Sequence, residues 1–91
     1  SGPAIKPIAL LKVHQVYQVA KAHGVPIIGQ GGITTASDAI EFMIAGASAG
    51  GVGTALFYDP LGCKKINAGL LDYIQEHDFG SIAKLVGSLR L

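Results

Sequence analysis

The apolar positions of the chain follow two different spacings in turn, and their order predicts the secondary structure. From Ile8 to about His23 they recur at helical intervals, and Pro7 suits the first turn of this helix. After Gly24, the uninterrupted apolar run 25–28 is typical of a short strand that is buried on both faces. The inward stripe of the first helix is expected to comprise Ile8, Leu11, Val13, Val16, Tyr17, Val19 and Ala20.

The same alternation continues to the C-terminus. The further expected elements are a helix capped by Thr34, Thr35 or Ser37 and ended by Gly46, a strand over 47–52, a helical turn over 55–58, a helix over 63–77 and a last helix from Gly80–Ser81 to Leu89. Strands that alternate with helices predict a parallel sheet. The fold class is therefore α/β, although Gly50 and Gly51 weaken the second strand.

Composition and strand count both indicate a piece of a larger domain. Hydrophobic residues make up 49% of the 91 residues and charged residues only 14%, which is too apolar for a free-standing domain of this size. Two strands are also too few for a closed barrel or a doubly wound sheet. Because the chain begins with Ser1 rather than Met, we expect further sequence upstream.

Charge and cysteine content exclude several classes of function. The net charge of +1 and the absence of a basic stripe argue against a nucleic-acid partner. No apolar run reaches the roughly 18 residues of a membrane helix, and no secretory signal is present. Cys63 is the single cysteine and cannot form an internal disulfide, which fits a cytoplasmic protein.

Two glycine turns carry the candidate chemistry. Gly31-Gly32 follows the first predicted strand and precedes a helix, and Gly53-Thr54 occupies the same place after the second strand. Such turns expose backbone N–H groups at helix N-termini, so together they predict a phosphate-binding corner. The simpler interpretation is a tight turn without ligand at Gly31-Gly32 and a helix cap at Thr54.

Four segments, in order and at matching separations, resemble one known family. They are Ser1-Gly2-Pro3-Ala4-Ile5-Lys6-Pro7-Ile8-Ala9-Leu10, Val25-Pro26-Ile27-Ile28-Gly29-Gln30-Gly31-Gly32-Ile33, Ala45-Gly46-Ala47-Ser48-Ala49 and Val52-Gly53-Thr54-Ala55. With these segments the chain resembles the C-terminal part of dihydroorotate dehydrogenase of class 1, particularly the class 1B catalytic subunit. Gly50-Gly51 departs from the family, which usually has bulkier strand residues there.

This resemblance implies that residues 1–91 are the C-terminal part of a single FMN-binding (β/α)8 TIM barrel domain. The segment would supply the seventh and eighth strands, after which such barrels commonly hold phosphate. The implied reaction is the oxidation of dihydroorotate to orotate in pyrimidine biosynthesis. The implied FMN-binding residues are Gly2, Gly31, Gly32, Gly53 and Thr54.

The resemblance also implies what this chain lacks. The family's catalytic base, a cysteine in class 1, its flavin-ring lysine and its orotate-binding asparagines all lie upstream, so we expect no catalysis from the segment alone. The implied partners are the rest of the barrel, further copies in a homo-oligomer, and an iron–sulfur flavoprotein subunit that transfers electrons.

The remaining polar residues favour ordinary structural roles. Cys63 lies far from the expected position of the base, and His14, His23 and His77 lack the spacing of metal ligands. Lys6 lies near the first loop and could help to hold an anion, but a solvated lysine is the favoured interpretation. Asp38 and Glu41 are expected to be acids at a helix start. Two other functions stay open: a different phosphate-binding barrel enzyme, and an inactive fragment that associates with itself through exposed sheet edges.

Overall fold

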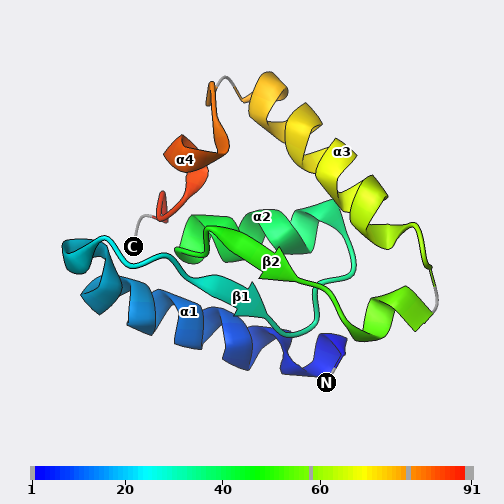
Figure 1. The fold of residues 1–91 in the computed structure, drawn as a ribbon, viewed down its shortest axis with the longest axis horizontal. Coiled ribbons are helices and arrows are strands. Elements are labelled where there is room, and N and C mark those ends of the chain that lie inside the picture. The colour runs from blue at the N-terminus through cyan, green and yellow to red at the C-terminus, as the bar shows by residue number, and fades with distance from the viewer. Residues whose placement is uncertain (1, 58, 78, 90–91) are drawn as a thin grey trace.

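The computed structural model describes residues 2–57, 59–77 and 79–89 (Figure 1). A two-stranded parallel sheet, β1 (Ile28–Gln30) and β2 (Ala49–Gly51), lies at its centre. Helices α1 (Lys6–Ala20) and α2 (Ala36–Ala45) pack against each other and against the sheet. Helix α3 (Gly62–Glu76) packs on α2, and the single turn α4 (Ile82–Leu85) follows it. The fold is thus two layers, sheet and helices, in the predicted order.

The first helix ends as expected but has two apolar faces. Pro7 lies in its first turn, a 3₁₀ turn η2 (Lys21–His23) extends it, and Gly24 ends it with φ at +66°. Val13 and Ala20 are buried, and Tyr17 is partly buried. The prediction of a single inward stripe is wrong for four of its residues. Their side chains are 52–67% exposed: Ile8, Leu11, Val16 and Val19. They form a second face of α1 that nothing in the described chain covers.

The first strand begins later than predicted, and local hydrogen bonding explains the shift. The N–H of Val25 donates to the carbonyl of Ala20 and so closes the end of the helix, and Pro26 has no N–H to donate. Pairing therefore starts with the carbonyl of Ile27, which accepts from Ser48. The ladder then joins Ile28 to Ala49, Gly29 to Gly50 and Gln30 to Gly51.

The two faces of the sheet differ in what covers them. Gly29 and Gly50 face the helices: a Cβ at residue 29 would lie 2.6 Å from the ring of Phe42, and one at residue 50 would lie 3.1 Å from Ile33. Ile28 and Gln30 occupy the opposite face and are exposed, Ile28 at 68%. Phe42 therefore excludes a larger residue at position 29, whereas at position 50 only the end of the Ile33 side chain is close.

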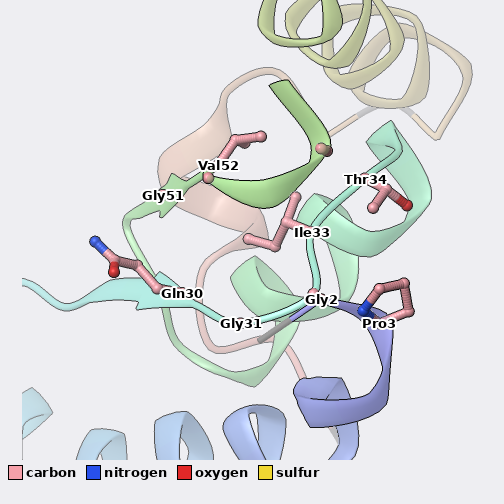
Figure 2. Close-up of a pocket in the computed structure, with 11 residues that line it drawn as sticks. Gly2, Pro3, Gln30, Gly31, Ile33, Thr34, Gly51 and Val52 are labelled. Carbon is pink, nitrogen blue, oxygen red and sulfur yellow. The ribbon is translucent and has the colours of Figure 1, made fainter. Parts of the chain in front are cut away.

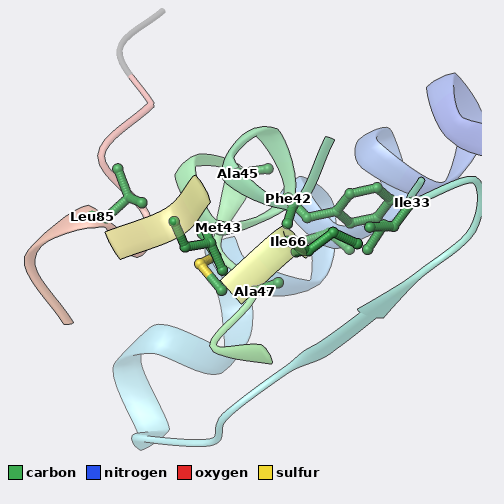
Figure 3. Close-up of a cluster of buried hydrophobic side chains, with 10 residues drawn as sticks. Ile33, Phe42, Met43, Ala45, Ala47, Ile66 and Leu85 are labelled. Carbon is green, nitrogen blue, oxygen red and sulfur yellow. The ribbon is translucent and has the colours of Figure 1, made fainter. Parts of the chain in front are cut away.

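The hydrophobic core lies between the sheet, α2 and α3. Figure 3 shows Phe42 beside Ile33 and Ile66, with Leu85 from the C-terminal segment next to Met43. Phe42 and Leu85 are fully buried. On α3, Ile66, Leu70 and Ile74 point inward, but Leu71 is exposed.

The C-terminal segment is less helical than predicted. Val86 has an extended conformation, which ends α4 after one turn, and Gly87 follows with φ at +73°. The chain then runs along the end of α2, where the N–H groups of Gly87 and Leu89 donate to the carbonyls of Met43 and Ile44. The Leu89 bond satisfies a carbonyl that α2 leaves free at its C-terminus, whereas the Met43 carbonyl also accepts from Gly46. Across the described ranges, no helix has both the length and the apolar character needed to cross a membrane.

Candidate functional site

A cleft of about 450 Å³ opens at the carboxyl ends of β1 and β2 (Figure 2). Because the strands are parallel, the turns that follow Gln30 and Gly51 meet at the same edge of the sheet. The N-terminal segment completes the cleft from a third direction. Its lining comprises Gly2, Pro3, Gln30, Gly31, Gly32, Ile33, Thr34, Gly51, Val52, Gly53 and Ala55.

The cleft brings together four of the five residues that the sequence indicated. Gly2, Gly31, Gly32 and Gly53 all line it, although they come from three separate segments. The side chain of Thr54 lies outside the described part of the structure. Its backbone begins the 3₁₀ turn η3 (Thr54–Phe57), between two lining residues. This turn matches the predicted helical turn, of which Tyr58 lies outside the described residues.

The Gly31-Gly32 turn is tightly packed against the start of the chain. Gly31 and Gly32 have φ at +127° and +78°, which other residues rarely adopt. A Cβ at residue 32 would lie 2.8 Å from the carbonyl oxygen of Gly2 and 3.1 Å from the Cα of Pro3. One at residue 31 would lie 2.7 Å from the Cβ of Ala9. Packing alone therefore explains both glycines.

The Gly53 turn is open by contrast. Gly53 has an ordinary φ, and a Cβ at this position would meet no described atom within 4 Å. Nothing in the described chain explains why a glycine stands there. The space beside it belongs to the cleft, so a ligand that approaches the backbone closely is a physical reason for the missing side chain.

The cleft offers neutral hydrogen-bond donors. Within residues 2–57, 59–77 and 79–89, no recorded hydrogen bond occupies the N–H of Gly32 or of Gly53. No lining residue is charged. The N-terminus of α2 follows the first turn, and its aligned peptide dipoles favour an anion. Backbone donors beside a helix N-terminus are the usual protein partners of a phosphate group.

The helix start beside the cleft has a reciprocal cap. The hydroxyl of Thr35 accepts from the N–H of Asp38, at 3.2 Å, and the carboxylate of Asp38 accepts from the N–H of Thr35, at 3.1 Å. The Asp38 carboxylate also accepts from the N–H and the hydroxyl of Thr34, both at 2.9 Å. Thr35 is thus the cap among the three predicted candidates, in the pattern Thr-x-x-Asp.

Lys6 has a role that the sequence analysis missed. It was expected to be solvated, but its Nζ lies 2.7 Å from Asp38 Oδ1 and 3.2 Å from Glu41 Oε2. Partial burial opposes ionisation of Asp38, but the hydrogen bonds from Lys6, Thr34 and Thr35 outweigh it and hold the pKa of this carboxyl well below its usual range. The same two acids raise the pKa of Lys6. Sequence spacing gave no signal, because Lys6 and Asp38 are 32 residues apart.

The other candidate side chains lie away from the cleft. Cys63 is exposed on α3, and His77 stacks on Tyr73 at the end of that helix. His14 is on α1 and touches Gln18. Among the residues that the structure describes, no cluster of three or more His, Cys, Asp or Glu side chains could hold a metal ion.

A parallel sheet with helices on one face and a cleft between glycine turns at its carboxyl edge defines the class: an α/β fold with its candidate site where (β/α)8 barrels place theirs. Comparison with known proteins then identifies the family. A family profile described as "Dihydroorotate dehydrogenase" matches residues 1–74, which is most of the chain. The chain therefore belongs to the dihydroorotate dehydrogenase family.

Similar curated proteins and solved structures agree with this assignment. The "Dihydroorotate dehydrogenase B (NAD(+)), catalytic subunit" of Geotalea daltonii is 50% identical over all 91 residues, and that of Geotalea uraniireducens is 52% identical over 98% of the chain. The ligand-free dihydroorotate dehydrogenase of Eimeria tenella superimposes on 97% of the chain with a TM-score of 0.89 and 29% identity. The ferulenol complex of the same enzyme gives a TM-score of 0.88 at 28% identity.

These matches confirm the predicted fold class, two parallel strands and flanking helices of a (β/α)8 barrel. The chain covers only 29% and 28% of the length of the two Geotalea proteins, and 24% and 23% of the two Eimeria chains. It is therefore comparable to one part of these relatives. Membership of the family implies a flavin cofactor.

Proposed function

We propose that the cleft binds the phosphate end of FMN in an enzyme that oxidises dihydroorotate to orotate in pyrimidine biosynthesis. The backbone N–H groups of Gly31, Gly32, Gly53 and Thr54 donate to the phosphate, and the backbone of Gly2 contacts the cofactor. The observation that carries the proposal is the convergence of Gly2, Gly31, Gly32 and Gly53 on one cleft. Family membership supplies the cofactor class and the reaction.

The chemistry of the cleft fits a phosphate group. Free N–H donors at Gly32 and Gly53 and the N-terminus of α2 supply partial positive charge without a basic side chain. The open space beside Gly53 admits an atom where a side chain would stand. The alternative of a different phosphate-binding barrel enzyme loses its support, because the family comparisons agree on dihydroorotate dehydrogenase.

In this proposal the chain anchors the cofactor and takes no proton itself. When bound, the flavin supplies the redox chemistry. The catalytic base is expected in the upstream part of the barrel, so this chain contributes no catalytic side chain. Its contribution is to hold the phosphate end in one place, which fixes the position of the reactive ring.

The uncovered apolar surfaces support a partner. The second face of α1 (Ile8, Leu11, Val16 and Val19) and the open face of the sheet at Ile28 are exposed in this chain. In a complete barrel the second face of α1 would meet a neighbouring helix and the open face of the sheet would face the barrel interior, so we propose the rest of the barrel as their occupant. The same surfaces would drive self-association of an isolated segment. Size-exclusion chromatography of the 91 residues alone tests this alternative.

We further propose a cytoplasmic homo-oligomer that works with an iron–sulfur flavoprotein subunit. The relatives support this, because their names describe a catalytic subunit of an NAD(+)-linked enzyme. Co-purification with the electron-transfer subunit of Geotalea daltonii, and NAD⁺ reduction by the pair, would test the partnership.

The main experiment uses a chimeric barrel, defined as the Geotalea daltonii catalytic subunit with its matching segment replaced by these 91 residues. We expect a yellow protein that releases FMN on denaturation and oxidises dihydroorotate. A folded but colourless chimera would overturn the proposal. If the chimera does not fold, the 91 residues are mixed with the remaining barrel of Geotalea daltonii. Failure to recover bound flavin from this mixture would also count against the proposal.

A further inference from the structure

The carboxylate of Asp38 joins two segments that are far apart in the sequence. Its Oδ2 accepts three hydrogen bonds from Thr34 and Thr35, the residues that lead from the Gly31-Gly32 turn into α2. Its Oδ1 accepts from Lys6, the first residue of α1, at 2.7 Å. An ordinary helix cap needs only hydrogen bonds such as those from Thr34 and Thr35. The bond to Lys6 therefore adds a link between α1 and the glycine turn.

Lys6 is in turn tied to the other side of the cleft. A 3₁₀ turn, η1 (Pro3–Ile5), connects Gly2 to Lys6, with hydrogen bonds from Ile5 to Gly2 and from Lys6 to Pro3. A Cβ at residue 32 would lie 2.9 Å from the Cβ of Lys6, so the stem of Lys6 packs directly on Gly32. Lys6 thus sits where the Gly2-Pro3 segment meets the Gly31-Gly32 turn.

The charged groups of Lys6 and Asp38 form an ion pair, and Lys6 also contacts Glu41. The side chains of Lys6 and Asp38 are 25% and 14% exposed, so the ion pair is partly shielded from water. The Lys6 ammonium contacts Asp38 and Glu41, and Lys6 is not a lining residue of the cleft. Removal of Lys6 would leave the Asp38 carboxylate partly buried without its cationic partner, whereas removal of Asp38 would leave Lys6 paired with Glu41 alone.

Resting on the proposed function, we propose that the Lys6–Asp38 pair is a positioning element of the phosphate site. It holds the Gly2-Pro3 segment and the Gly31-Gly32 turn at the separation that the phosphate requires. Neither side chain touches the phosphate. The pair acts through the backbone groups whose spacing it sets, as supporting residues do in other pre-organised sites.

The competing explanation is that the pair only supports the cap of α2 and has no specific effect on the ligand. This explanation predicts a different pattern of affinities. Loss of a cap lowers stability, and any effect on binding would be equal for FMN and for riboflavin, which lacks the phosphate. Loss of a positioning element weakens FMN more than riboflavin. The ratio of the two affinities therefore separates the explanations, independently of enzyme activity.

The decisive variant is Lys6→Met in the chimeric barrel, because methionine keeps the stem on Gly32 and leaves the Thr35–Asp38 cap intact. Lys65→Met is the matched control, since it removes an exposed ion pair to Asp59 of similar length, 2.8 Å, from residues that do not line the cleft. Affinities for FMN and riboflavin are measured by flavin fluorescence on the apoprotein. We expect Lys6→Met to reduce the FMN-to-riboflavin ratio about tenfold, and Lys65→Met to leave it unchanged.

Each outcome bears on one of the two proposals. If the parent chimera binds FMN no better than riboflavin, the proposed phosphate site is wrong. If the parent discriminates and Lys6→Met retains the full ratio, the positioning role is wrong. Should Lys6→Met fail to fold, Asp38→Asn removes the same ion pair and keeps an oxygen for the cap. An unchanged ratio in Asp38→Asn would overturn the inference equally.

Discussion

The two glycine turns of the cleft look alike in sequence but differ in how the chain supports them. The Gly31-Gly32 turn is braced by the Gly2-Pro3 segment and by the Asp38 hydrogen bonds. The Gly53 turn has an ordinary backbone conformation and open space beside it. The first turn is therefore organised by contacts within this chain, whereas the second leaves space beside Gly53 that the described chain does not fill. Of these two turns, only the second contains a glycine that packing within the described chain does not explain.

The largest expected effect is that of Gly32→Ala in the chimeric barrel. A Cβ at this position meets the backbone of Gly2 and Pro3, and the positive φ adds a cost of about 1–2 kcal/mol. We expect a lowered free energy of unfolding together with lost FMN binding. Urea unfolding and flavin content measure the two effects. Wild-type stability in this variant would show that the first turn is not braced as described.

Gly53→Ala should separate binding from folding. The new methyl group meets no described atom, so the free energy of unfolding should change by less than about 0.5 kcal/mol. The affinity for FMN should fall severalfold, because the methyl group occupies space that the ligand needs, and riboflavin should be affected less. Equal FMN affinity in Gly53→Ala and the parent would contradict the proposal that this turn faces a phosphate.

Acid should remove the stability that the ionised Asp38 carboxylate contributes to the first turn. The native pKa of Asp38 lies below its unfolded value of about 3.9, so its ionised form contributes stability that is fully present above that pH. This contribution is lost as the pH falls below about 4. The difference in unfolding free energy between the parent and Asp38→Asn should therefore be constant near neutral pH and shrink in acid. A difference that stays constant down to pH 2 would contradict this assignment.

The smallest effect is expected on the outer face of α1. Val19→Ser replaces a side chain that is 67% exposed in this chain. The substitution should leave the free energy of unfolding of the isolated 91 residues almost unchanged. If α1 packs against the remaining barrel of Geotalea daltonii, the substitution should weaken the association of the two pieces. A binding titration between the two pieces measures this. Unaltered association would move the proposed contact away from Val19.

The sequence predicted the order of elements and three lining glycines, Gly31, Gly32 and Gly53, because these depend on local signals, whereas Gly2 was implied only by the family resemblance. Helical spacing, Gly24 and the Thr35–Asp38 pattern act within a few residues, and they are confirmed. The start of β1, the short α4 and the outer face of α1 were mispredicted. The start of β1 depends on the hydrogen bond from Val25 to Ala20 and on Pro26, which lacks an N–H. The other two depend on more distant partners: the segment after α4 donates to carbonyls of α2, and nothing in the described chain covers the outer face of α1.

Within the site, the same distinction holds. The glycine turns are visible in the sequence, but the Lys6–Asp38 pair is not, because folding brings together residues 32 positions apart. Gln30 was also missed as a lining residue. Its side chain fills the space above Gly51, where a Cβ would lie 2.5 Å from the Gln30 Cγ. Gly51 and Gln30 are paired across the strands, and only the register reveals that they share this space.

A crystal structure of the chimeric barrel with FMN would test the central claim most directly. We predict that the phosphate lies in the cleft, with its oxygens within about 3.2 Å of the backbone nitrogens of Gly32 and Gly53. A phosphate held elsewhere, with the cleft filled by protein or water, would contradict the account.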